Sequence, residues 1–403
     1  MKRTTCSACG AGDLEVFLNL GSSPIADAYT DGPGLDARRY RLQVAVCPKC
    51  RLAQLLEVVD PEVLFGTGYS FYSSASPPLS AYHARYAQDL LRDHGEQAAK
   101  GVLEIGSNDG DMLRHFAHLP HLGVDPALGP TEVAERDRGL IVTAESFSLQ
   151  LAQELDRRFG LVIANHVLAH VADVSDVLAG VAHALAPDGA AFIEVQYLPD
   201  LLVNNAFDLV YHEHRNFFSL STLESALWRH GLRVIDAQLT DRQGGSLRVA
   251  VVHAHLPVTA LRSFSSVQAQ VVGRLRYSEA WLNSFGAYEG MQGRAERIRD
   301  RLLDLLEAHR AYQVVALYGA PAKATTLLNF CGLTAAELPY CWDTTVAKQG
   351  RHIPGTGIEI RAPWQGPRPG AFLLAAWNYL RPIMKGNPGF EWIVPFPAPL
   401  VLS

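Results

Sequence analysis

The sequence has few charged residues, no long apolar run and no cluster of basic side chains. Charged residues make up 19% of its 403 residues, below the roughly 25% of an average soluble protein, while hydrophobic residues reach 48%. Such a composition excludes extensive disorder. No apolar run approaches the roughly 18 residues that suggest a membrane span. Since the net charge is −6 and the sequence has no Lys/Arg block, neither nucleic acid nor an anionic membrane is expected as the main partner.

The first 20 residues lack the apolar core of a signal peptide, because two cysteines and several charges interrupt them. We therefore expect a cytoplasmic protein, whose six cysteines serve as metal ligands or buried thiols rather than as disulfides. At about 150 residues per domain, the length predicts two or three domains.

Four of the six cysteines form two CxxC turns, Cys6–Cys9 and Cys47–Cys50, with 37 residues between them. This pattern favours one tetrahedral Zn²⁺ over four unrelated thiols, and a redox role is less favoured because neither turn begins a βαβ helix. With four protein ligands the zinc has no open position and is expected to be structural. The long spacing predicts a small β-rich insert between the turns.

The middle third alternates apolar and helical segments, which is typical of a nucleotide-binding α/β domain. A strand over 102–105 enters a glycine turn and a short helix over 111–117, and a second strand ends at Asp125. Further elements are predicted as strands over 161–164, 190–195 and 249–252 and a helix over 174–185 closed by Pro187 to Gly189. The alternation predicts a parallel sheet.

The glycine turn after the first of these strands is ExGxNxG rather than GxGxxG. The Glu104 carboxylate would repel a pyrophosphate, so the turn favours a cationic ligand, with a degenerate dinucleotide fold as the alternative. With its strand-end Asp125, this stretch resembles the class I methyltransferases that bind S-adenosylmethionine. That resemblance implies that Gly106 lets the backbone approach the ligand and that Asp125 binds the ribose hydroxyls. It places 145–147 near adenine and 165–166 near the methionine end. The candidate cofactor residues are Glu104, Gly106, Asn108, Asp109, Gly110, Asp125, Pro126, Glu145, Ser146, Phe147, Asn165 and His166.

Four side chains that can exchange protons lie in a row at Tyr211, His212, Glu213 and His214. Histidine titrates near neutrality, so His212 or His214 could remove a proton from a carbon next to a carbonyl, while a tyrosine hydroxyl or a carboxylate stabilises the enolate. Either histidine alone could equally be a core residue. The cluster as a whole indicates proton-transfer chemistry.

An aromatic segment over 65–74 links the cysteine region to the α/β domain and carries the hydroxyls of Tyr69 and Tyr72. Two interpretations are open. The segment either packs between domains or brings a tyrosine hydroxyl into the site.

The last third predicts a second α/β unit. After an amphipathic helix over 294–306, a strand over 314–318 enters a turn over 319–324, whose amides and Lys323 could meet a phosphate. A basic turn over 348–355 and the end of a buried strand beginning at Phe372 could complete a diphosphate pocket, with an exposed polar loop as the alternative. The candidate substrate residues are Tyr318, Lys323, Asp343, Lys348, Arg351, His352 and Asn378.

Together these motifs resemble the S-adenosylmethionine-dependent C-methyltransferases of nucleotide-activated (dTDP) 4-keto-deoxysugars. The resemblance rests on CxxC…CxxC, YSFYSS, EIGSNDG, YHEHRNFFS, GGSLRV, YGAPAKATTLLN and KQGRHIPG, and it covers essentially the whole chain. It implies an α/β fold in three parts. These are a zinc-binding module with the aromatic linker (1–75), a central class I, Rossmann-like methyltransferase domain (76–255) and a C-terminal α/β domain that helps to hold the sugar nucleotide (256–403).

The same resemblance implies catalytic roles. His214 is expected to take the C3 proton of the sugar, with Glu213 beside it, Tyr211 near the sugar, and Tyr72 or Tyr69 reaching in from the linker. Phe71 stands in the middle of this linker motif where family members often carry tyrosine, which leaves the choice between the two tyrosines open.

The expected reaction is methylation at C3 of a dTDP-4-keto-deoxyhexose through an enolate, with S-adenosylmethionine as donor and a structural Zn²⁺. One alternative is reduction of the 4-ketone with NADPH, alone or combined with methylation, although GxGxxG is absent after Tyr318. A second alternative is a zinc-ribbon interaction protein whose α/β domains have lost their activity. The identity of the sugar is not predicted by the sequence.

Overall fold

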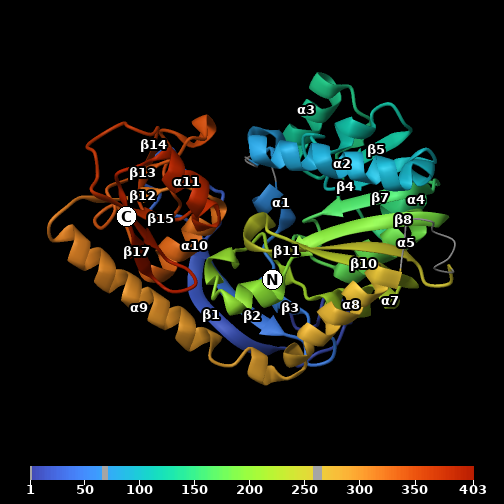
Figure 1. Cartoon of the computed structure of the whole chain (residues 1–403), viewed down its shortest axis with the longest axis horizontal. Coiled ribbons are helices and arrows are strands. Elements are labelled where there is room, and N and C mark those ends of the chain that lie inside the picture. Colours follow the sequence, from blue (N-terminus) through green and yellow to red (C-terminus); the bar gives the residue numbers. More distant parts are fainter. Residues whose placement is uncertain (1, 66–70, 257–265) are drawn as a thin grey trace.

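The computed structural model describes residues 2–65, 71–256 and 266–403, in which three β-sheets organise the chain. Figure 1 shows the central and C-terminal sheets in separate lobes, with the N-terminal strands beneath and between them. An α/β fold with three parts is confirmed. None of the helices within these ranges is both long and apolar enough to cross a lipid bilayer.

The N-terminal sheet joins strands of the cysteine-rich module to a strand from the middle of the chain. Its antiparallel order is β1-β2-β3-β9, and β1 and β2 lie between the two cysteine pairs, which confirms the expected β-rich insert. The strands are β1 Glu15–Pro24, β2 Arg39–Val46, β3 Ala53–Leu55 and β9 Asn216–Phe217. Because β9 begins two residues after His214, this sheet ties the module to the candidate catalytic segment.

The central sheet has the order β10-β11-β8-β7-β4-β5-β6, and β11 alone runs against the other six strands. Its strands are β4 Val102–Ile105, β5 His121–Val124, β6 Val142–Thr143, β7 Phe159–Asn165, β8 Leu185–Gln196, β10 Leu232–Thr240 and β11 Ser246–His253. The expected parallel sheet is therefore confirmed for five consecutive strands, and an antiparallel strand separates the sixth from them.

Helices cover both faces of the central sheet because alternate side chains of its strands point to opposite sides. On β7, Leu161 and Ile163 pack with α2 and α3, whereas Val162 and Ala164 pack with α4, α5 and α7. The helices of this part are α2 Pro77–Ala98, η2 Leu113–Phe116, α3 Leu128–Arg138, α4 Leu149–Glu154, α5 Val174–Ala184, α7 Leu220–Trp228 and α8 Ser266–Ser278. Side chains cap three of them, because Ser148, Asp173 and Ser219 accept hydrogen bonds from amides in the first turn.

The C-terminal sheet has the order β14-β13-β12-β15-β16-β17 and is parallel except for β17. Its strands are β12 Val315–Tyr318, β13 Tyr340–Trp342, β14 Glu359–Arg361, β15 Ala371–Leu374, β16 Glu391–Val394 and β17 Leu400–Leu402. The helices beside it are α9 Met291–Arg310, α10 Ala322–Cys331 and α11 Leu380–Gly386. Short connecting helices complete the chain, namely α1 Pro61–Phe65, η1 Ser73–Ala75, α6 Leu198–Val203, η3 Phe207–Leu209, η4 Arg242–Gly244, η6 Ala280–Asn283, η7 Phe285–Ala287, η8 Val346–Lys348 and η9 Trp377–Tyr379.

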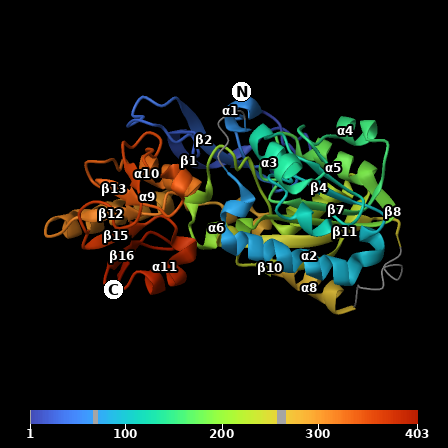
Figure 2. The same ribbon diagram turned by 90° about the horizontal axis from the view of Figure 1, so that it is seen from above.

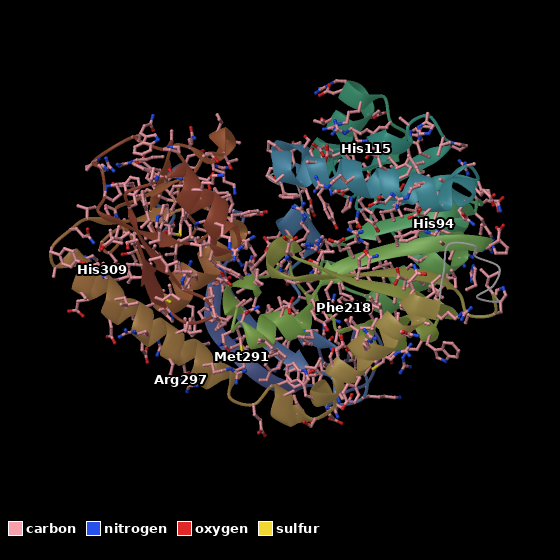
Figure 3. All side chains as sticks on the ribbon, viewed as in Figure 1. His94, His115, Phe218, Met291, Arg297 and His309 are labelled. Carbon is pink, nitrogen blue, oxygen red and sulfur yellow. The ribbon has the colours of Figure 1, made fainter. Side chains whose placement is uncertain are left out.

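The N-terminal module and the C-terminal lobe share one hydrophobic core. Leu18 and Leu42 of the first sheet belong to the same buried cluster as Phe207, Leu302 and Leu327. Helix α9 spans the two parts, with Met291 fully buried and Arg297 exposed (Figures 2 and 3). The orientation of the C-terminal lobe is therefore set by apolar packing.

Three local expectations were wrong. The predicted helix over 111–117 is only the short 3-10 helix η2. Strand β8 begins at Leu185, immediately after α5, so 187–189 form an irregularity within a strand pair instead of a turn. The strand beginning near Phe372 ends at Leu374, and 377–379 form the 3-10 helix η9. The second of these is a turn-like sequence that pairing with β7 takes into a strand, an effect that local propensity does not register.

Candidate functional site

The four cysteines of the CxxC turns come together as the sequence predicts. Their Sγ atoms all lie within 4.8 Å of one another, with 3.5 Å between Cys6 and Cys50 and 3.6 Å between Cys9 and Cys47. The residue after each turn is left-handed, Gly10 at φ 70° and Arg51 at φ 63°, which gives the two turns a matching shape. Four thiolates in this arrangement fit one tetrahedral zinc.

A cavity of about 650 Å³ lies where the three parts of the chain meet. It is lined by most of the predicted catalytic and cofactor residues and by three predicted substrate residues. The predicted residues on its wall are Gly106, Asn108, Asp125, Pro126, Ser146, Phe147, Asn165, His166, Tyr211, Glu213, His214, Lys323, Lys348 and Asn378.

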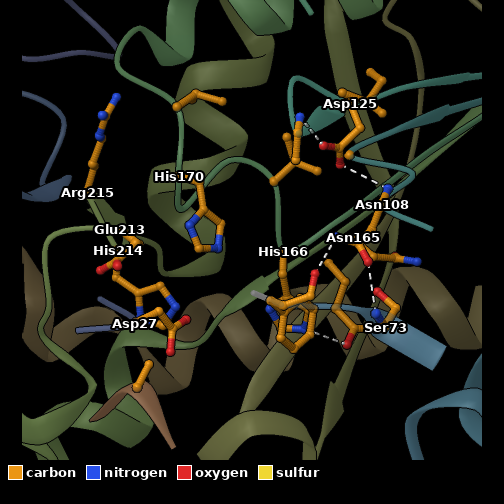
Figure 4. Close-up of a pocket in the computed structure, with 18 of the residues that line it drawn as sticks. Asp27, Ser73, Asn108, Asp125, Asn165, His166, His170, Glu213, His214 and Arg215 are labelled. Atoms are coloured by element: carbon orange, nitrogen blue, oxygen red, sulfur yellow. Dashed lines mark hydrogen bonds and ion pairs between the residues drawn. The ribbon is translucent and has the colours of Figure 1, made fainter. Parts of the chain in front are cut away.

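One end of this cavity is built by the glycine turn after β4 and the end of β5. Asp125 accepts hydrogen bonds from the amides of Asn108, at 2.9 Å, and Ala127, at 2.8 Å, so its carboxylate is fixed at the cavity wall (Figure 4). Gly106 has φ 71°, and a Cβ there would lie 2.5 Å from Cγ2 of Val167. Both side-chain atoms of Asn165 are buried without a hydrogen-bond partner among the described residues. This end offers a carboxylate and an unsatisfied amide to a ligand.

Four predicted cofactor residues, Glu104, Asp109, Gly110 and Glu145, do not line the cavity. Burial, reinforced by the charge of Asp125, raises the pKa of Glu104 well above its usual value. Asp109 binds Arg138 at 3.1 Å and also accepts from the hydroxyl of Ser74, which ties the linker to the glycine turn. The expected attraction of a cationic ligand by Glu104 is therefore weakened, because burial disfavours the charged form of its carboxyl group. Gly110 and Glu145 are likewise absent from the lining within the described ranges.

A buried ionic network that the sequence analysis missed supports this end of the cavity. Glu194, at the end of β8, binds His166 at 3.1 Å and Arg248 at 2.9 Å, and it accepts from the hydroxyl of Tyr82. Burial alone would raise its pKa, but His166 and Arg248 hold the pKa of Glu194 at about 2. One indication of this network lies in the sequence, since Glu194 is the single carboxylate in the otherwise apolar predicted strand 190–195.

The other end of the cavity contains a tyrosine–histidine pair. His214 Nδ1 lies 2.8 Å from the carbonyl oxygen of Leu209, and its Nε2 lies 2.8 Å from the Tyr211 hydroxyl. A carbonyl only accepts, so Nδ1 carries the proton and Nε2 the lone pair. Burial lowers the pKa of His214 well below its usual value, which keeps the ring neutral.

Two unpredicted residues face this pair. The ring of His170 lies 5.1 Å from that of His214, between the two ends of the cavity in Figure 4, and burial lowers the pKa of His170 to about 4. Asp27, from the N-terminal module, lines the cavity beside Glu213. Burial and the charge of Asp27 raise the pKa of Glu213 to about 8. The presence of His170 in the site could have been inferred from the sequence, because it follows His166 by four residues just after a strand. Nothing in the sequence indicated that Asp27 lines the cavity.

The remaining members of the predicted catalytic set lie outside the cavity or outside the described residues. His212 is fully buried, with its Nε2 3.3 Å from the Tyr40 carbonyl, so it is a core histidine. A Cβ on Gly129 would lie 2.8 Å from the Tyr72 hydroxyl, which places that hydroxyl at the start of α3. Tyr69 falls outside the described residues.

The C-terminal lobe contributes a buried lysine at the start of a helix. Lys323, in the first turn of α10, is 6% exposed, and its Nζ has no hydrogen-bond partner in the described parts of the chain. This Nζ lies 3.7 Å from the centre of the Trp377 ring and 3.9 Å from Asp208. Burial lowers the pKa of Lys323 to about 8, although the negative charge of Asp208 acts to raise it. A buried cation at the start of a helix, 3.9 Å from Asp208 and without a hydrogen bond among the described residues, favours an anionic ligand.

Five other predicted substrate residues mainly build this region. Asp343 accepts from the amide of Ala320 at 2.7 Å, and Lys348 donates to the carbonyl of the same residue at 2.8 Å. Arg351 and His352 bind the backbone of the N-terminal module, and Tyr318 accepts from Asn387. Of these five residues only Lys348 lines the cavity. Asn378 in η9, the remaining predicted substrate residue, also lines it.

Comparison with known proteins agrees with the three-part organisation. Residues 6–65 match a family model described as a zinc binding domain, residues 80–237 one described as a methyltransferase domain, and residues 241–397 one described as a C-methyltransferase C-terminal domain. The C-methyltransferase NovU of Streptomyces niveus is 36% identical over 415 aligned residues, which cover 99% of this chain and 96% of the relative.

Solved structures resemble part of the chain. An S-adenosylmethionine-dependent methyltransferase from Clostridium acetobutylicum ATCC 824 is 10% identical and covers 43% of this chain and 90% of its own, with a TM-score of 0.34. Magnesium protoporphyrin IX methyltransferase from Synechocystis PCC 6803 is 17% identical and covers 43% of this chain and 83% of its own, with a TM-score of 0.35. The fold of the central domain is established by its strand order and its family-model match, not by these two structures.

Proposed function

The chain belongs to the S-adenosylmethionine-dependent C-methyltransferases, and we propose that it methylates C3 of a dTDP-linked 4-keto-deoxyhexose through an enolate. The proposal is supported by one cavity that holds a neutral imidazole, a protonated carboxyl group and a buried lysine. We also propose that the enzyme works in the cytoplasm on small molecules, without nucleic-acid or membrane partners.

The glycine-turn end of the cavity fits the methyl donor. Asp125 would bind the ribose hydroxyls, Ser146 and Phe147 would flank adenine, and the unsatisfied amide of Asn165 would face the methionine end. Gly106 keeps this wall open because no Cβ obstructs it. S-adenosylmethionine, when bound, supplies an electrophilic methyl carbon.

His214 is the base in this proposal, and the observation that carries it is the hydrogen bond from His214 Nδ1 to Leu209. That bond leaves the lone pair on Nε2, where it accepts from the Tyr211 hydroxyl at 2.8 Å, and the low pKa keeps Nε2 unprotonated near pH 7. The substrate would displace this hydroxyl to reach the lone pair. The 4-ketone makes the neighbouring C3–H acidic, so the proton passes to Nε2 while its electron pair forms the enolate. Tyr211, already bonded to Nε2, is placed to orient the ring.

Glu213 and Lys323 have complementary roles. Because its raised pKa keeps Glu213 protonated near pH 7, it can donate a hydrogen bond to the enolate oxygen. Lys323 and the first amides of α10 would bind the diphosphate of the sugar nucleotide. The alternative of NADPH-dependent ketoreduction gains no support, because the turn after β12 reads Gly-Ala-Pro-Ala-Lys.

The test of this function is His214→Asn. We expect exchange of the C3 proton of a dTDP-4-keto-deoxyhexose into deuterated water, followed by NMR, to fall at least about 100-fold, since a positioned general base contributes roughly 10² to 10⁴. Affinity for S-adenosylmethionine should be unchanged, because His214 lies at the other end of the cavity.

The same change at an exposed histidine, His118→Asn, is the matched control. Exchange at the wild-type rate in His214→Asn would remove this residue from the base role. A panel of ketosugars with labelled donor would then show which carbon receives the methyl group, and methylation at a carbon other than C3 would contradict the proposed position.

A further inference from the structure

We propose that the first cysteine turn positions His170 and the catalytic His214 through a hydrogen bond between Ser7 and Asn216, an inference that rests on the proposed function for the role of His214. Ser7 lies between Cys6 and Cys9, and Asn216 lies two residues after His214. The zinc centre would then set active-site geometry in addition to stabilising its own module.

Two side chains of the N-terminal sheet hold Ser7 from one face. Gln54 of β3 and Asn216 of β9 are directly opposite each other in the antiparallel pair, so their side chains point to the same side. The Ser7 amide donates to Gln54 Oε1 at 3.0 Å, and the Ser7 hydroxyl donates to Asn216 Oδ1 at 2.8 Å. All three residues are buried, with exposed fractions of 7%, 0% and 0% in the order Ser7, Gln54, Asn216.

Asn216 also binds the loop that contains His170. The Asn216 side chain donates from Nδ2 to the carbonyls of Leu168 at 3.0 Å and Val171 at 2.9 Å. The Asn216 backbone amide donates to the carbonyl of Ala169 at 3.1 Å. Three carbonyls of one four-residue loop are therefore held by one asparagine. His170 lies within that loop, and its ring faces that of His214 at 5.1 Å.

The cysteine turn also contacts the helix that follows this loop. The Ser7 carbonyl accepts from the amide of Ser175 at 3.1 Å, in the first turn of α5, and Arg3 donates to the carbonyl of Ala172 at 2.8 Å. Together with the Asn216 contacts, the module thus binds residues 168–175 along their length. Zinc-bound Cys6 and Cys9 would fix Ser7 from both sides, because the metal immobilises the backbone of the turn.

Removal of one hydroxyl tests the coupling without removing a metal ligand. Ser7→Ala should leave Oδ1 of Asn216 buried and unsatisfied, so the loop over 168–172 can shift. In the zinc-bound enzyme we expect one zinc per chain and S-adenosylmethionine affinity within about twofold of wild type. The imidazole ¹⁵N signals of His170 and His214 should shift, and C3 proton exchange should fall about 10- to 100-fold, the size expected for misplaced catalytic groups.

Two variants separate positioning from general damage. Ser22→Ala, at an exposed serine of the same module, should change none of these quantities. Ser7→Thr keeps the hydroxyl and should restore most of the exchange rate. Unchanged histidine signals in Ser7→Ala, equal effects of Ser22→Ala, or no rescue by Ser7→Thr would each overturn the proposal.

Two further measurements decide the proposal if the exchange assay or the Ser7→Ala variant fails. If wild-type enzyme exchanges no C3 proton, the proposed function fails, whereas the histidine signals still decide the coupling. If Ser7→Ala does not fold, amide hydrogen exchange of the wild-type chain before and after zinc chelation replaces it. Protection should then fall at 168–172 while it persists at 102–105, and unchanged protection at 168–172 would overturn the coupling.

Discussion

Two adjacent side chains, Glu213 and His214, carry no charge near pH 7 for the same reason. Burial disfavours the ionised form of each, which raises the pKa of Glu213 to about 8 and lowers that of His214. The residue types could be predicted from sequence because they lie in one short motif. Their protonation states could not, since burial and the nearby Asp27 come from other parts of the chain.

Glu213→Gln should therefore change how stability depends on pH. The folded-state pKa of Glu213 lies above that of an unfolded glutamate, so the stability that its protonated form contributes is full below about pH 4.3 and is lost as pH rises toward 8. Glutamine stays neutral, so the midpoint of thermal unfolding of the variant, relative to wild type, should rise by a few degrees between pH 5 and pH 9.

The surface change Glu15→Gln controls for the loss of one negative charge. A difference between Glu213→Gln and wild type that does not grow with pH would show that this carboxyl group does not hold its proton in the folded protein.

At the scale of elements, the turn between β4 and η2 was predictable because its glycine pattern is local. The ionic network that supports the same end of the cavity was not, because Glu194, Tyr82 and Arg248 lie on β8, α2 and β11 and meet only through the order of strands and helices. The two-residue strand β9 escaped prediction for the same reason, since its pairing with β3 spans more than 150 residues of sequence.

Gly106→Ala should weaken binding of the methyl donor at this turn. A left-handed alanine costs roughly 1–2 kcal/mol, and at Gly106 the new Cβ would also displace Val167, which adjoins His166. Titration calorimetry should show at least about a tenfold increase in the dissociation constant for S-adenosylmethionine.

Gly139→Ala is the matched variant, since Gly139 has φ 66° and open space around its Cβ position. It should cost similar stability and leave the dissociation constant unchanged. Equal weakening by both variants would show that lost stability, rather than the shape of the turn, governs binding.

At the scale of the whole molecule, the cavity exists only because three parts of the chain converge. Asp27 comes from the N-terminal module, His214 from the centre and Lys323 from the C-terminal lobe. The sequence predicted three parts and about a third of the residues on the wall, but it did not predict which basic residues would face inward. Arg351 instead binds the N-terminal module, because that module packs against the C-terminal lobe.

Lys323→Met should raise KM for the sugar nucleotide about 10- to 100-fold, consistent with the roughly 1.5–3 kcal/mol of a hydrogen bond to a charged group. The methionine keeps an apolar stem beside Trp377 and removes the charge. Steady-state kinetics should show no change in KM for S-adenosylmethionine.

The exposed Lys385→Met in the same lobe provides the comparison. An unchanged KM for the sugar nucleotide in Lys323→Met would place the diphosphate elsewhere in the cavity.

The core shared by the two ends of the chain also affects synthesis on the ribosome. The first sheet needs Asn216 and Phe217 to gain its fourth strand, and its apolar face is covered by residues near 300 and beyond. The apolar face of the nascent N-terminal segment therefore stays partly exposed until most of the polypeptide has emerged. Early capture of zinc by its four thiolates would keep this segment ordered during that interval.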